Sequence, residues 1–374
     1  MDASTVDPQA VLRRAGADYP PIDRSAGRIA IVGGFVRDVT LGRGPKELDL
    51  VVEGSAEVLA RSFGGELTVH DAFGTATASG DGWRIDVAMA RAERYPAPGA
   101  LPEVAPASIE ADLGRRDFTV NAIAVTLEGE LIAAQDALED LAARRLRVFH
   151  EHSFTDDPSR VLRLARYAER LGFAVEARTA ELAQAATFAT LSGGRLGGEL
   201  RLVLAEPDPL AVLARVAHQL PIALDRELLE SALALAPPGS DRAMLVLGVA
   251  ATDPAWLETL ELNAGERDIA LACAHATPAP ADTRPSALWL LWRRVPIEAV
   301  AVAGARGDRA AAARWIDELR HVSLEIGGDD LLSAGIAEGP EIGRRLDRAL
   351  AAKLDGEIDG GREAELSFAL GAGG

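Results

Sequence analysis

Two acidic residues separated by one position, Glu47 and Asp49, open an apolar segment whose composition predicts a strand over residues 48–52. Side chains two positions apart on a strand point to the same side, so both carboxylates can face a single site. Carboxylate oxygens are the ligands that a hard divalent cation such as Mg²⁺ prefers. The spacing therefore predicts a metal site at the beginning of this strand.

A double glycine, Gly33 and Gly34, lies upstream of the acidic pair and follows a second predicted strand at residues 29–32. Glycines have no Cβ atom, so the backbone can approach an anion closely. Arg37 and the beginning of the following predicted helix add positive potential. We therefore expect a phosphate group beside the metal.

A third carboxylate, that of Asp86, lies in the middle of a predicted strand at residues 84–88. In-line phosphoryl transfer by two metal ions about 3.5–4 Å apart calls for such a third acidic ligand. An acidic side chain within a strand is costly unless it has a site or a partner to face. Asp86 therefore either completes the metal site or pairs with Arg84 at the edge of a sheet.

Together these motifs resemble the signature of the class II tRNA nucleotidyltransferase and bacterial poly(A) polymerase family, in the polymerase-beta-like superfamily. The resemblance covers residues 28–205 closely, and its motifs are GGFVRD (33–38), LGR (41–43), ELDLVVEG (47–54), DLGRRDFTVNA (112–122) and FTDDPSR (154–160). It implies a Mg²⁺-dependent nucleotidyltransferase in which Glu47, Asp49 and Asp86 are the catalytic, metal-binding carboxylates. Glu47 stands where the family usually has Asp.

The resemblance also implies which residues bind the nucleotide. The double glycine and Arg37 would hold the triphosphate. Arg116 would contact the nucleotide and Asp117 the ribose hydroxyls, with Asn121 in a supporting role. From its position alone, Asp117 is also a candidate helix N-cap, and the two roles are compatible.

A base-reading role follows for Asp157 and Arg160, beside Asp156, which replaces the usual Glu. A carboxylate accepts a hydrogen bond from the exocyclic amine that cytosine and adenine share, and a guanidinium donates to the adjacent ring nitrogen. Uracil and guanine carry a carbonyl at that place and are rejected. Arg163 and Arg166 follow on the same predicted helix, near one face, and are included among the nucleotide-binding residues.

Two further segments carry expectations of their own. Arg195 and Glu199, four positions apart, predict an ion pair on a helix surface. Residues 91–107 contain four prolines and no clean periodicity, so they predict a long loop.

The elements that position these residues predict an α/β head, a mixed β-sheet with helices, followed by an all-α neck, body and tail. The predicted domains are a catalytic head (1–149), a helical neck with the base-recognition motif (150–205), a helical body (206–325) and a helical, RNA-binding tail (326–374). The helical segments are rich in Ala and Leu and are separated by short turns.

Composition excludes several classes of protein. A net charge of −18, from 39 basic and 57 acidic residues, argues against a protein that coats nucleic acid nonspecifically. No apolar run approaches the length of about 20 residues that a membrane span needs, so no membrane association is expected. A single cysteine, Cys273, excludes an intramolecular disulfide, and with no signal peptide evident we expect a cytoplasmic protein.

The predicted function is template-independent addition of C and A residues from CTP and ATP to the 3′ end of tRNA, with release of pyrophosphate. A-only addition, CC-only addition and poly(A) tailing share the same motifs and stay open as alternatives. A noncatalytic nucleotide-binding homologue is a further alternative, disfavoured because every carboxylate position is still acidic. Transfer to a small molecule is disfavoured because the helical part exceeds what such an acceptor requires.

Overall fold

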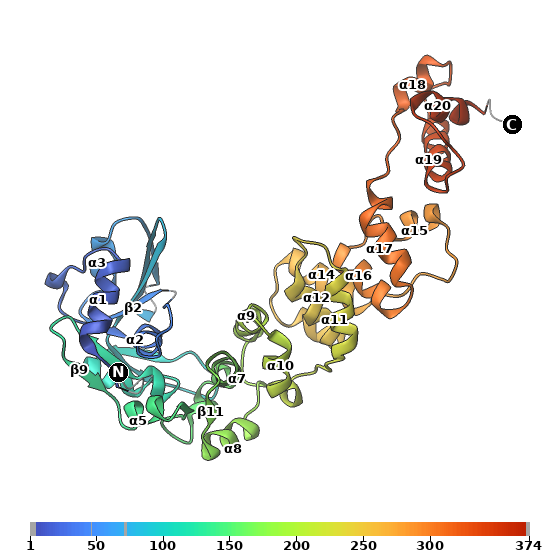
Figure 1. The fold of residues 1–374 in the computed structure, drawn as a ribbon. Helices are drawn as coiled ribbons and strands as arrows, with labels where there is room; N and C mark the ends of the chain where they lie inside the picture. The colour runs from blue at the N-terminus through green and yellow to red at the C-terminus, as the bar shows by residue number, and fades with distance from the viewer. Residues whose placement is uncertain (1–4, 46, 71–72, 372–374) are drawn as a thin grey trace. The chain divides into compact units, whose positions relative to one another are not determined.

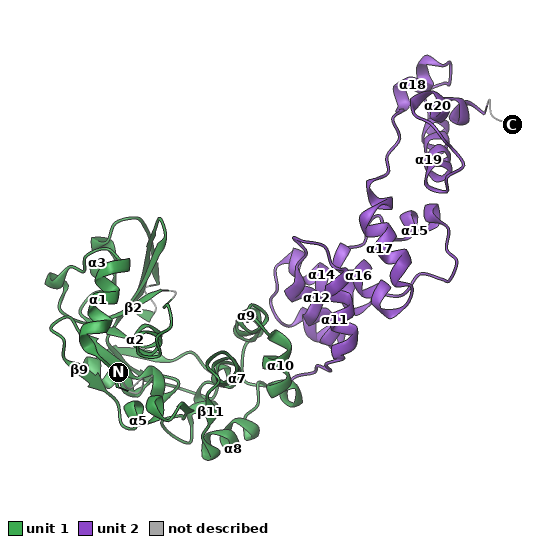
Figure 2. Ribbon diagram, viewed as in Figure 1, with its two compact units in different colours: residues 1–219 green, residues 220–374 purple. Residues whose placement is uncertain are grey.

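Short β-branched and aliphatic segments in the first part of the chain form a mixed sheet with helices packed around it (Figure 1). The structure, a computed structural model, describes residues 5–45, 47–70 and 73–371. The chain divides into two units, Met1–Gln219 and Leu220–Gly374 (Figure 2). The further boundaries predicted at residues 149/150, 205/206 and 325/326 stay a proposal.

Seven strands of the first unit make the main sheet, in the order β3-β4-β5-β2-β1-β8-β9. They are β1 (Arg28–Val32), β2 (Leu48–Glu53), β3 (Glu66–His70), β4 (Thr75–Gly80), β5 (Trp83–Met89), β8 (Ile123–Thr126) and β9 (Leu131–Ala133). β2 and β5 are parallel, and their neighbours pair antiparallel. The prediction of a mixed sheet in the head is confirmed.

The strand register places the acidic residues side by side. Asp49 of β2 is paired with Asp86 of β5, and Asp86 is in turn paired with Thr77 of β4. Residues directly opposite each other on neighbouring strands present their side chains on the same face of a sheet. The local period of two and this pairing together bring the carboxylates to one place.

Helices of the first unit cover the sheet and continue the chain beyond it. They are α1 (Pro8–Asp18), α2 (Gly34–Thr40), α3 (Ala56–Ser62), α4 (Ile109–Gly114), α5 (Ala137–Ala142), α6 (Ser153–Asp156), α7 (Ser159–Leu171), α8 (Ala177–Ala185), α9 (Gly193–Leu204) and α10 (Pro209–Val216). Buried apolar side chains from β1, β2, β8 and α4, among them Val32, Val51, Leu113 and Ala124, form a core under the site. A two-stranded parallel pair, β10 (Arg145–Leu146) with β11 (Ala174–Val175), flanks α7.

Residues 91–107 are not the long loop that their prolines predict. Strands β6 (Arg91–Arg94) and β7 (Glu103–Pro106) form an antiparallel hairpin. Its connection at residues 95–102 contains three of the four prolines, and the fourth, Pro106, ends β7. A two-stranded ribbon tolerates proline at its ends because few ladder hydrogen bonds are lost there. With four residues each, β6 and β7 are too short to show the apolar alternation by which a strand is recognised.

The second unit is helical, as predicted. Its helices are α11 (Arg226–Leu235), α12 (Arg242–Ala250), α13 (Pro254–Glu258), α14 (Ala264–Ala274), α15 (Pro285–Trp292), α16 (Ile297–Arg306), α17 (Arg309–Asp317), α18 (Gly328–Ser333), α19 (Pro340–Leu354) and α20 (Arg362–Leu370). One apolar core includes the almost fully buried α16 and the pair Trp292 and Trp315. A smaller core, around Ile326, Leu331 and Ala349, holds α18, α19 and α20 together. Among the described helices, none is both long and apolar enough to cross a membrane.

Candidate active site

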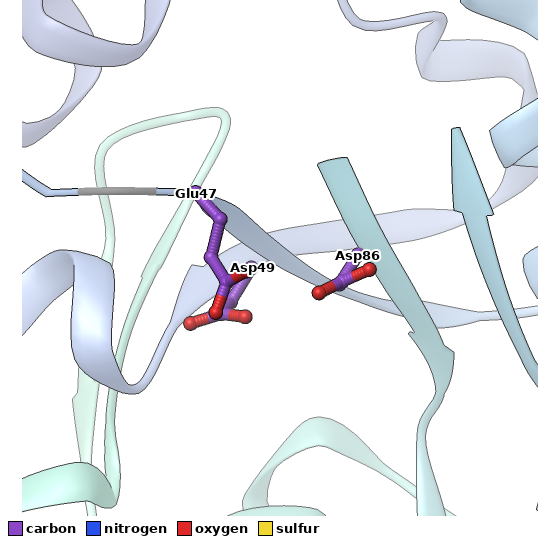
Figure 3. A group of neighbouring side chains, drawn as sticks. All are labelled: Glu47, Asp49 and Asp86. Carbon is purple, nitrogen blue, oxygen red and sulfur yellow. The ribbon is translucent and has the colours of Figure 1, made fainter. Parts of the chain in front are cut away.

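The three predicted metal ligands converge at the β2–β5 pair (Figure 3). Each of Glu47, Asp49 and Asp86 offers a carboxylate oxygen, and these oxygens lie within 4.8 Å of one another. Asp86 also accepts a hydrogen bond from the Thr77 hydroxyl. The Arg84 guanidinium lies 3.1 Å from the Asp86 Oδ1 atom and 3.4 Å from the Glu47 Oε2 atom. Both readings of Asp86, as a third carboxylate of the cluster and as a partner of Arg84, therefore hold in the same geometry.

Burial and the neighbouring carboxylates change the acid–base behaviour of Asp49. Burial, together with the nearby charge of Glu47 and the weaker effect of Asp86, raises the pKa of Asp49 to about 7, although Arg116 and Arg37 oppose the shift. Like charges at this separation disfavour full ionisation until a cation neutralises them. A cluster of hard oxygen donors with excess negative charge fits a divalent cation such as Mg²⁺ or Mn²⁺.

The glycine turn lies next to this cluster. Gly33 has φ +66°, in the left-handed region that glycine adopts without strain. A Cβ atom on Gly33 would lie 2.7 Å from the Arg116 Nη1 atom, and one on Gly34 would lie 3.5 Å from the Asp49 Oδ2 atom. Any side chain at Gly33 would therefore displace the guanidinium that faces the carboxylates.

Arg37 of α2 is held almost fully buried beside the turn, with 2% of its surface exposed. Its Nε atom donates to the Asp38 Oδ1 atom at 2.8 Å, and its Nη1 atom donates to the Asn121 side-chain oxygen. The guanidinium also lies over the ring of Tyr167, 5.3 Å from the ring centroid. A cation fixed from several sides in this way is preorganised for an anion.

The ribose-binding candidates form a second buried group. Asp117 accepts hydrogen bonds from the Phe118 backbone N–H and from the Asn121 amide, both at 2.9 Å, and it pairs with Arg163 at 2.9 Å. Burial alone would raise the pKa of Asp117, but Arg163 and Asn121 outweigh it, so that the pKa lies below its ordinary value. Arg116 donates at 3.0 Å to the buried carboxylate of Asp112. The carboxylate of Asp117 therefore stays ionised and fixed. It is not the helix N-cap that its position suggested, because the short helix at Thr119–Asn121 has Phe118 as its N-cap and no side-chain cap hydrogen bond.

The base-reading candidates lie between α6 and α7. The Oδ1 atom of Asp157 accepts hydrogen bonds from the Ser159 N–H and hydroxyl and from the Arg195 Nη2 atom, the last at 2.7 Å. These three bonds from the described residues all end on Oδ1. Arg160 is buried and donates at 3.0 Å to the Arg115 carbonyl. One oxygen of Asp157 is thereby immobilised, which fixes the direction in which the other points.

The surface ion pair predicted for Arg195 and Glu199 is replaced by a longer-range contact. Besides Asp157, Arg195 donates at 2.7 Å to the carbonyl of Gly99, in the β6–β7 connection. Glu199 lies 3.7 Å from Arg166 instead. Arg195 therefore links the hairpin to the base-reading carboxylate, a role that the spacing of four could not indicate.

One cavity of about 870 Å³ in the first unit unites these groups. Of the predicted site residues, those that line it are Gly33, Gly34, Arg37, Glu47, Asp49, Asp86, Arg116, Asp117, Asn121, Asp157, Arg160 and Arg163. Several lining residues with polar or charged side chains were not singled out from the sequence, among them Thr77, Glu93, Tyr95 and Tyr167. Tyr167 follows Arg163 by four positions on α7, which is the one sequence signal that could have found it.

Arg166 is the predicted nucleotide-binding residue that is absent from this lining among the described residues. Its Nε atom lies 3.0 Å from Glu206, and both side chains are largely buried, 13% and 7% exposed. At about 100° per residue, Arg166 lies about 120° around the helix from Arg160, toward α9 rather than toward the cavity. A structural ion pair explains its position.

We expect the variant Arg166→Met to lose stability and to keep its nucleotide affinity. Removing Arg166 leaves the largely buried Glu206 with only its longer contact to Arg170, at 3.8 Å, and the lost hydrogen bond to a charged group costs about 2 kcal/mol. Thermal unfolding and the KM for CTP and ATP provide the measurements. A KM that rises tenfold in a variant of unchanged melting temperature would return Arg166 to the nucleotide site.

Comparisons with known proteins agree with this site. Residues 29–147 match the model of the poly A polymerase head domain. The chain is 32% identical over 400 residues to an A-adding tRNA nucleotidyltransferase of Geobacter sulfurreducens, an alignment that covers 91% of this chain and 44% of that protein. Other relatives are named CC-adding tRNA nucleotidyltransferase, from Deinococcus radiodurans, and multifunctional CCA protein, from Pseudomonas aeruginosa. The chain spans less than half the length of the A-adding relatives, 44%, 47% and 24%.

Solved structures extend the similarity over the whole chain. A CCA-adding enzyme in its apo form superposes with a TM-score of 0.77 and 28% identity, over 98% of this chain and 95% of that one. The Thermotoga maritima CCA-adding enzyme complexed with tRNA superposes with a TM-score of 0.69 and 28% identity, over 92% and 91%. The head motifs, the helical remainder and these similarities agree: residues 29–147 match a poly A polymerase head domain, and the whole chain is similar to the class II tRNA nucleotidyltransferases.

Proposed function

We propose that the protein is a nucleotidyltransferase that adds C and A residues from CTP and ATP to the 3′ end of tRNA without a template, releasing pyrophosphate. The observation that carries the proposal is the convergence of three groups on one cavity: the carboxylate cluster, the glycine turn with Arg37, and Asp157 with Arg160. They correspond in type to the metal, phosphate and base ends of a bound nucleoside triphosphate. The names of the relatives support tRNA as the acceptor.

Glu47, Asp49 and Asp86 would hold Mg²⁺, which supplies positive charge that lowers the pKa of an attacking hydroxyl and stabilises a leaving pyrophosphate. Residues of the chain bind and orient the triphosphate. Gly33 lets the triphosphate approach the backbone, and Arg37 neutralises part of its charge. With the triphosphate fixed there, the tRNA 3′-hydroxyl attacks the α-phosphate, and the bond to the pyrophosphate breaks in line.

The residues at the base end of the cavity select the nucleotide. The free oxygen of Asp157 accepts from the exocyclic amine of cytosine or adenine, and Arg160 donates to the adjacent ring nitrogen. Asp117, kept ionised by Arg163, accepts from the ribose hydroxyls. A 2′-hydroxyl contact of this kind distinguishes ribonucleotides from deoxynucleotides.

The helical remainder of the chain is proposed to hold the tRNA. Neck (150–205), body (206–325) and tail (326–374) would contact the acceptor arm through its shape and phosphates, as RNA helices are generally recognised. With a net charge of −18, the contacts must come from a local basic track rather than from the overall charge. The reaction is proposed to take place in the cytoplasm.

A-only addition, CC-only addition and poly(A) tailing are the competing activities on this scaffold, and one assay separates them. Purified protein is incubated with tRNA transcripts that lack CCA, end in C or end in CC, each with labelled CTP, ATP or both. We expect addition to stop after CCA is complete on each transcript. Extension only of the CC-ending transcript by A, arrest after CC, or runaway A addition would each replace the proposal with the corresponding alternative.

The same reaction tests whether the protein is catalytic at all. Pyrophosphate release is measured with tRNA, without tRNA and with EDTA in place of the divalent cation. We expect release that requires both tRNA and the cation. Tight nucleotide binding with no release under any condition would favour a noncatalytic homologue.

A further inference from the structure

Tyr167 on α7 gathers cationic side chains that come from two separate elements. The guanidinium of Arg37, from α2, lies 5.3 Å from the centroid of the Tyr167 ring, and that of Arg170, one turn further along α7, lies 5.1 Å from it. All three residues line the cavity. Arg37 is the cation beside the glycine turn, so the ring faces the phosphate end of the site.

The ring itself is held in place. Phe118, which is fully buried and directly follows Asp117 in the chain, packs edge-on against it with 5.8 Å between the ring centroids and an angle of 85° between their planes. This edge-to-face arrangement is a favourable one for two aromatic rings. The orientation of Tyr167 is therefore set by the same segment that carries the ribose-binding candidate.

Electrostatics explain why an aromatic ring is needed at this point. Arg37 and Arg170 carry like charges on one wall of the cavity and repel each other whenever no anion lies between them. The negative face of an aromatic ring attracts a guanidinium without adding a formal charge. Asp38 already holds Arg37 from one side, and Glu206 lies 3.8 Å from Arg170. The ring attracts both guanidinium groups from a further side without adding another negative charge near the triphosphate.

We propose that Tyr167 is a positioning residue for the triphosphate: its ring face holds the Arg37 guanidinium, with that of Arg170, in the orientation that binds the phosphates. The ring touches none of the reacting atoms and acts through the arginines. This proposal rests on the nucleotidyltransferase function for its place in the reaction, but its binding step is measured without tRNA.

The test compares Tyr167→Leu, which removes the ring, with Tyr167→Phe, which keeps the ring and removes the hydroxyl. Calorimetric titration of the full chain with ATP, inorganic pyrophosphate and adenosine, with Mg²⁺ present, gives the affinities. For Tyr167→Leu we expect the Kd of ATP and of pyrophosphate to rise about fivefold to thirtyfold, the range of one or two desolvated cation–π contacts. The Tyr167 hydroxyl also accepts a hydrogen bond from Arg163, the partner of Asp117. Any change in the Kd of adenosine is therefore expected to be the same in Tyr167→Leu and Tyr167→Phe, whereas the Kd of pyrophosphate stays within about twofold in Tyr167→Phe.

Two comparisons separate this role from a merely structural one. In Arg37→Ala, the further change Tyr167→Leu lowers ATP affinity by a smaller factor than it does in the wild type, because only the contribution through Arg170 is left to lose. Glu169→Gln, two positions from Tyr167 and paired at the surface with Arg215 at 2.9 Å, is the control and keeps wild-type affinities. If Tyr167→Leu unfolds at the assay temperature, Tyr167→Met takes its place with the same expectation.

Three results would overturn the inference: wild-type ATP affinity in the variant that lacks the ring, a loss of adenosine affinity in that variant as large as its loss of pyrophosphate affinity, or a loss of pyrophosphate affinity in Tyr167→Phe as large as in Tyr167→Leu. Failure of the proposed function is distinguishable from these. A wild-type protein that binds ATP but extends no tRNA would refute tRNA nucleotidyl transfer, and the affinity differences at Tyr167 would still be measured.

Discussion

Asp49→Asn is expected to abolish nucleotide incorporation while leaving the fold intact. The variant keeps the size and shape of the side chain and removes a charge from the carboxylate cluster at the β2–β5 pair. Losing one preorganised electrostatic contact in a transition state costs about 4 kcal/mol, or about a thousandfold in rate. Incorporation of labelled CTP and ATP into tRNA, at saturating Mg²⁺, measures the loss.

The same variant should be at least as stable as the wild type when no metal is present. Burial and the charge of Glu47 raise the pKa of Asp49 to about 7 in the folded chain, above its ordinary value of 3.8. A raised pKa in the folded state means that stability is lost as the pH rises from about 4 through about 7. In EDTA, the melting temperature of Asp49→Asn minus that of the wild type is therefore expected to be larger at pH 8 than at pH 5.

The rise in melting temperature on adding Mg²⁺ is a second measurement on the same variant. A cation that binds only the folded state raises the melting temperature, and the rise should be large for wild type and small for Asp49→Asn. Asp81→Asn, an exposed carboxylate in the turn between β4 and β5, is the matched control and should behave as wild type in both assays. Wild-type incorporation by Asp49→Asn would remove this residue from the proposed metal site.

Local sequence was sufficient to bring Glu47 and Asp49 together, because the period of two along a strand is a property of the strand itself. Asp86 was harder, since its position depends on which strand lies beside β2. In the structure, β5 lies beside β2 and pairs with it in parallel. Patterns among residues that are neighbours in the sequence do not encode which strands pair. Its position within a strand made Asp86 a candidate, and the resemblance to a known family decided between a metal ligand and a partner of Arg84.

Helix geometry explains where the prediction for α7 was incomplete. Arg160 and Arg163 line the cavity, but three further positions turn the side chain of Arg166 toward Glu206. Tyr167 was not among the predicted site residues, since an aromatic residue at helical spacing is usually part of a core. Its contact with Arg37 joins residues 130 positions apart, which spacing arguments cannot reach.

The hairpin and Arg195 show the same limit at longer range. Strands β6 and β7 have four residues each, too few for the alternating apolar side chains that indicate a strand. Arg195 follows Asp157 by 38 positions, and its hydrogen bond to that carboxylate is a product of how α9 packs against α7. This contact, made by tertiary packing, replaces the pair with Glu199 that spacing within α9 predicted.

Asp157→Asn is expected to reverse the choice of base rather than merely weaken it. The Ser159 N–H and hydroxyl and the Arg195 guanidinium all donate to Oδ1, so the oxygen of an asparagine side chain would occupy that position. Its NH₂ group would then point toward the base, where the wild type presents an acceptor. A donor at this place repels the amine of cytosine or adenine and matches the carbonyl of uracil or guanine.

The expected size of the change follows from the cost of an unpaired polar group. A site built to hydrogen-bond one substrate group rejects an analogue that lacks it by about 10⁴-fold or more. Incorporation of CTP and ATP by Asp157→Asn should fall about a hundredfold, incorporation of UTP should rise, and the preference for CTP over UTP should vanish or invert. Single-nucleotide incorporation into tRNA, with each of the four triphosphates alone, gives kcat/KM for every base.

Asp156→Asn is the matched control for this inversion, because it makes the same chemical change at the adjacent residue, outside the described lining of the cavity. Its preference for CTP over UTP should stay within about threefold of the wild-type value. An equal loss for all four nucleotides in Asp157→Asn would mean that the carboxylate supports the fold of α6 and α7 and does not read the base. Inversion in Asp156→Asn instead would move the reading of the base to that neighbour, since its carboxylate would then be the one that faces the exocyclic group.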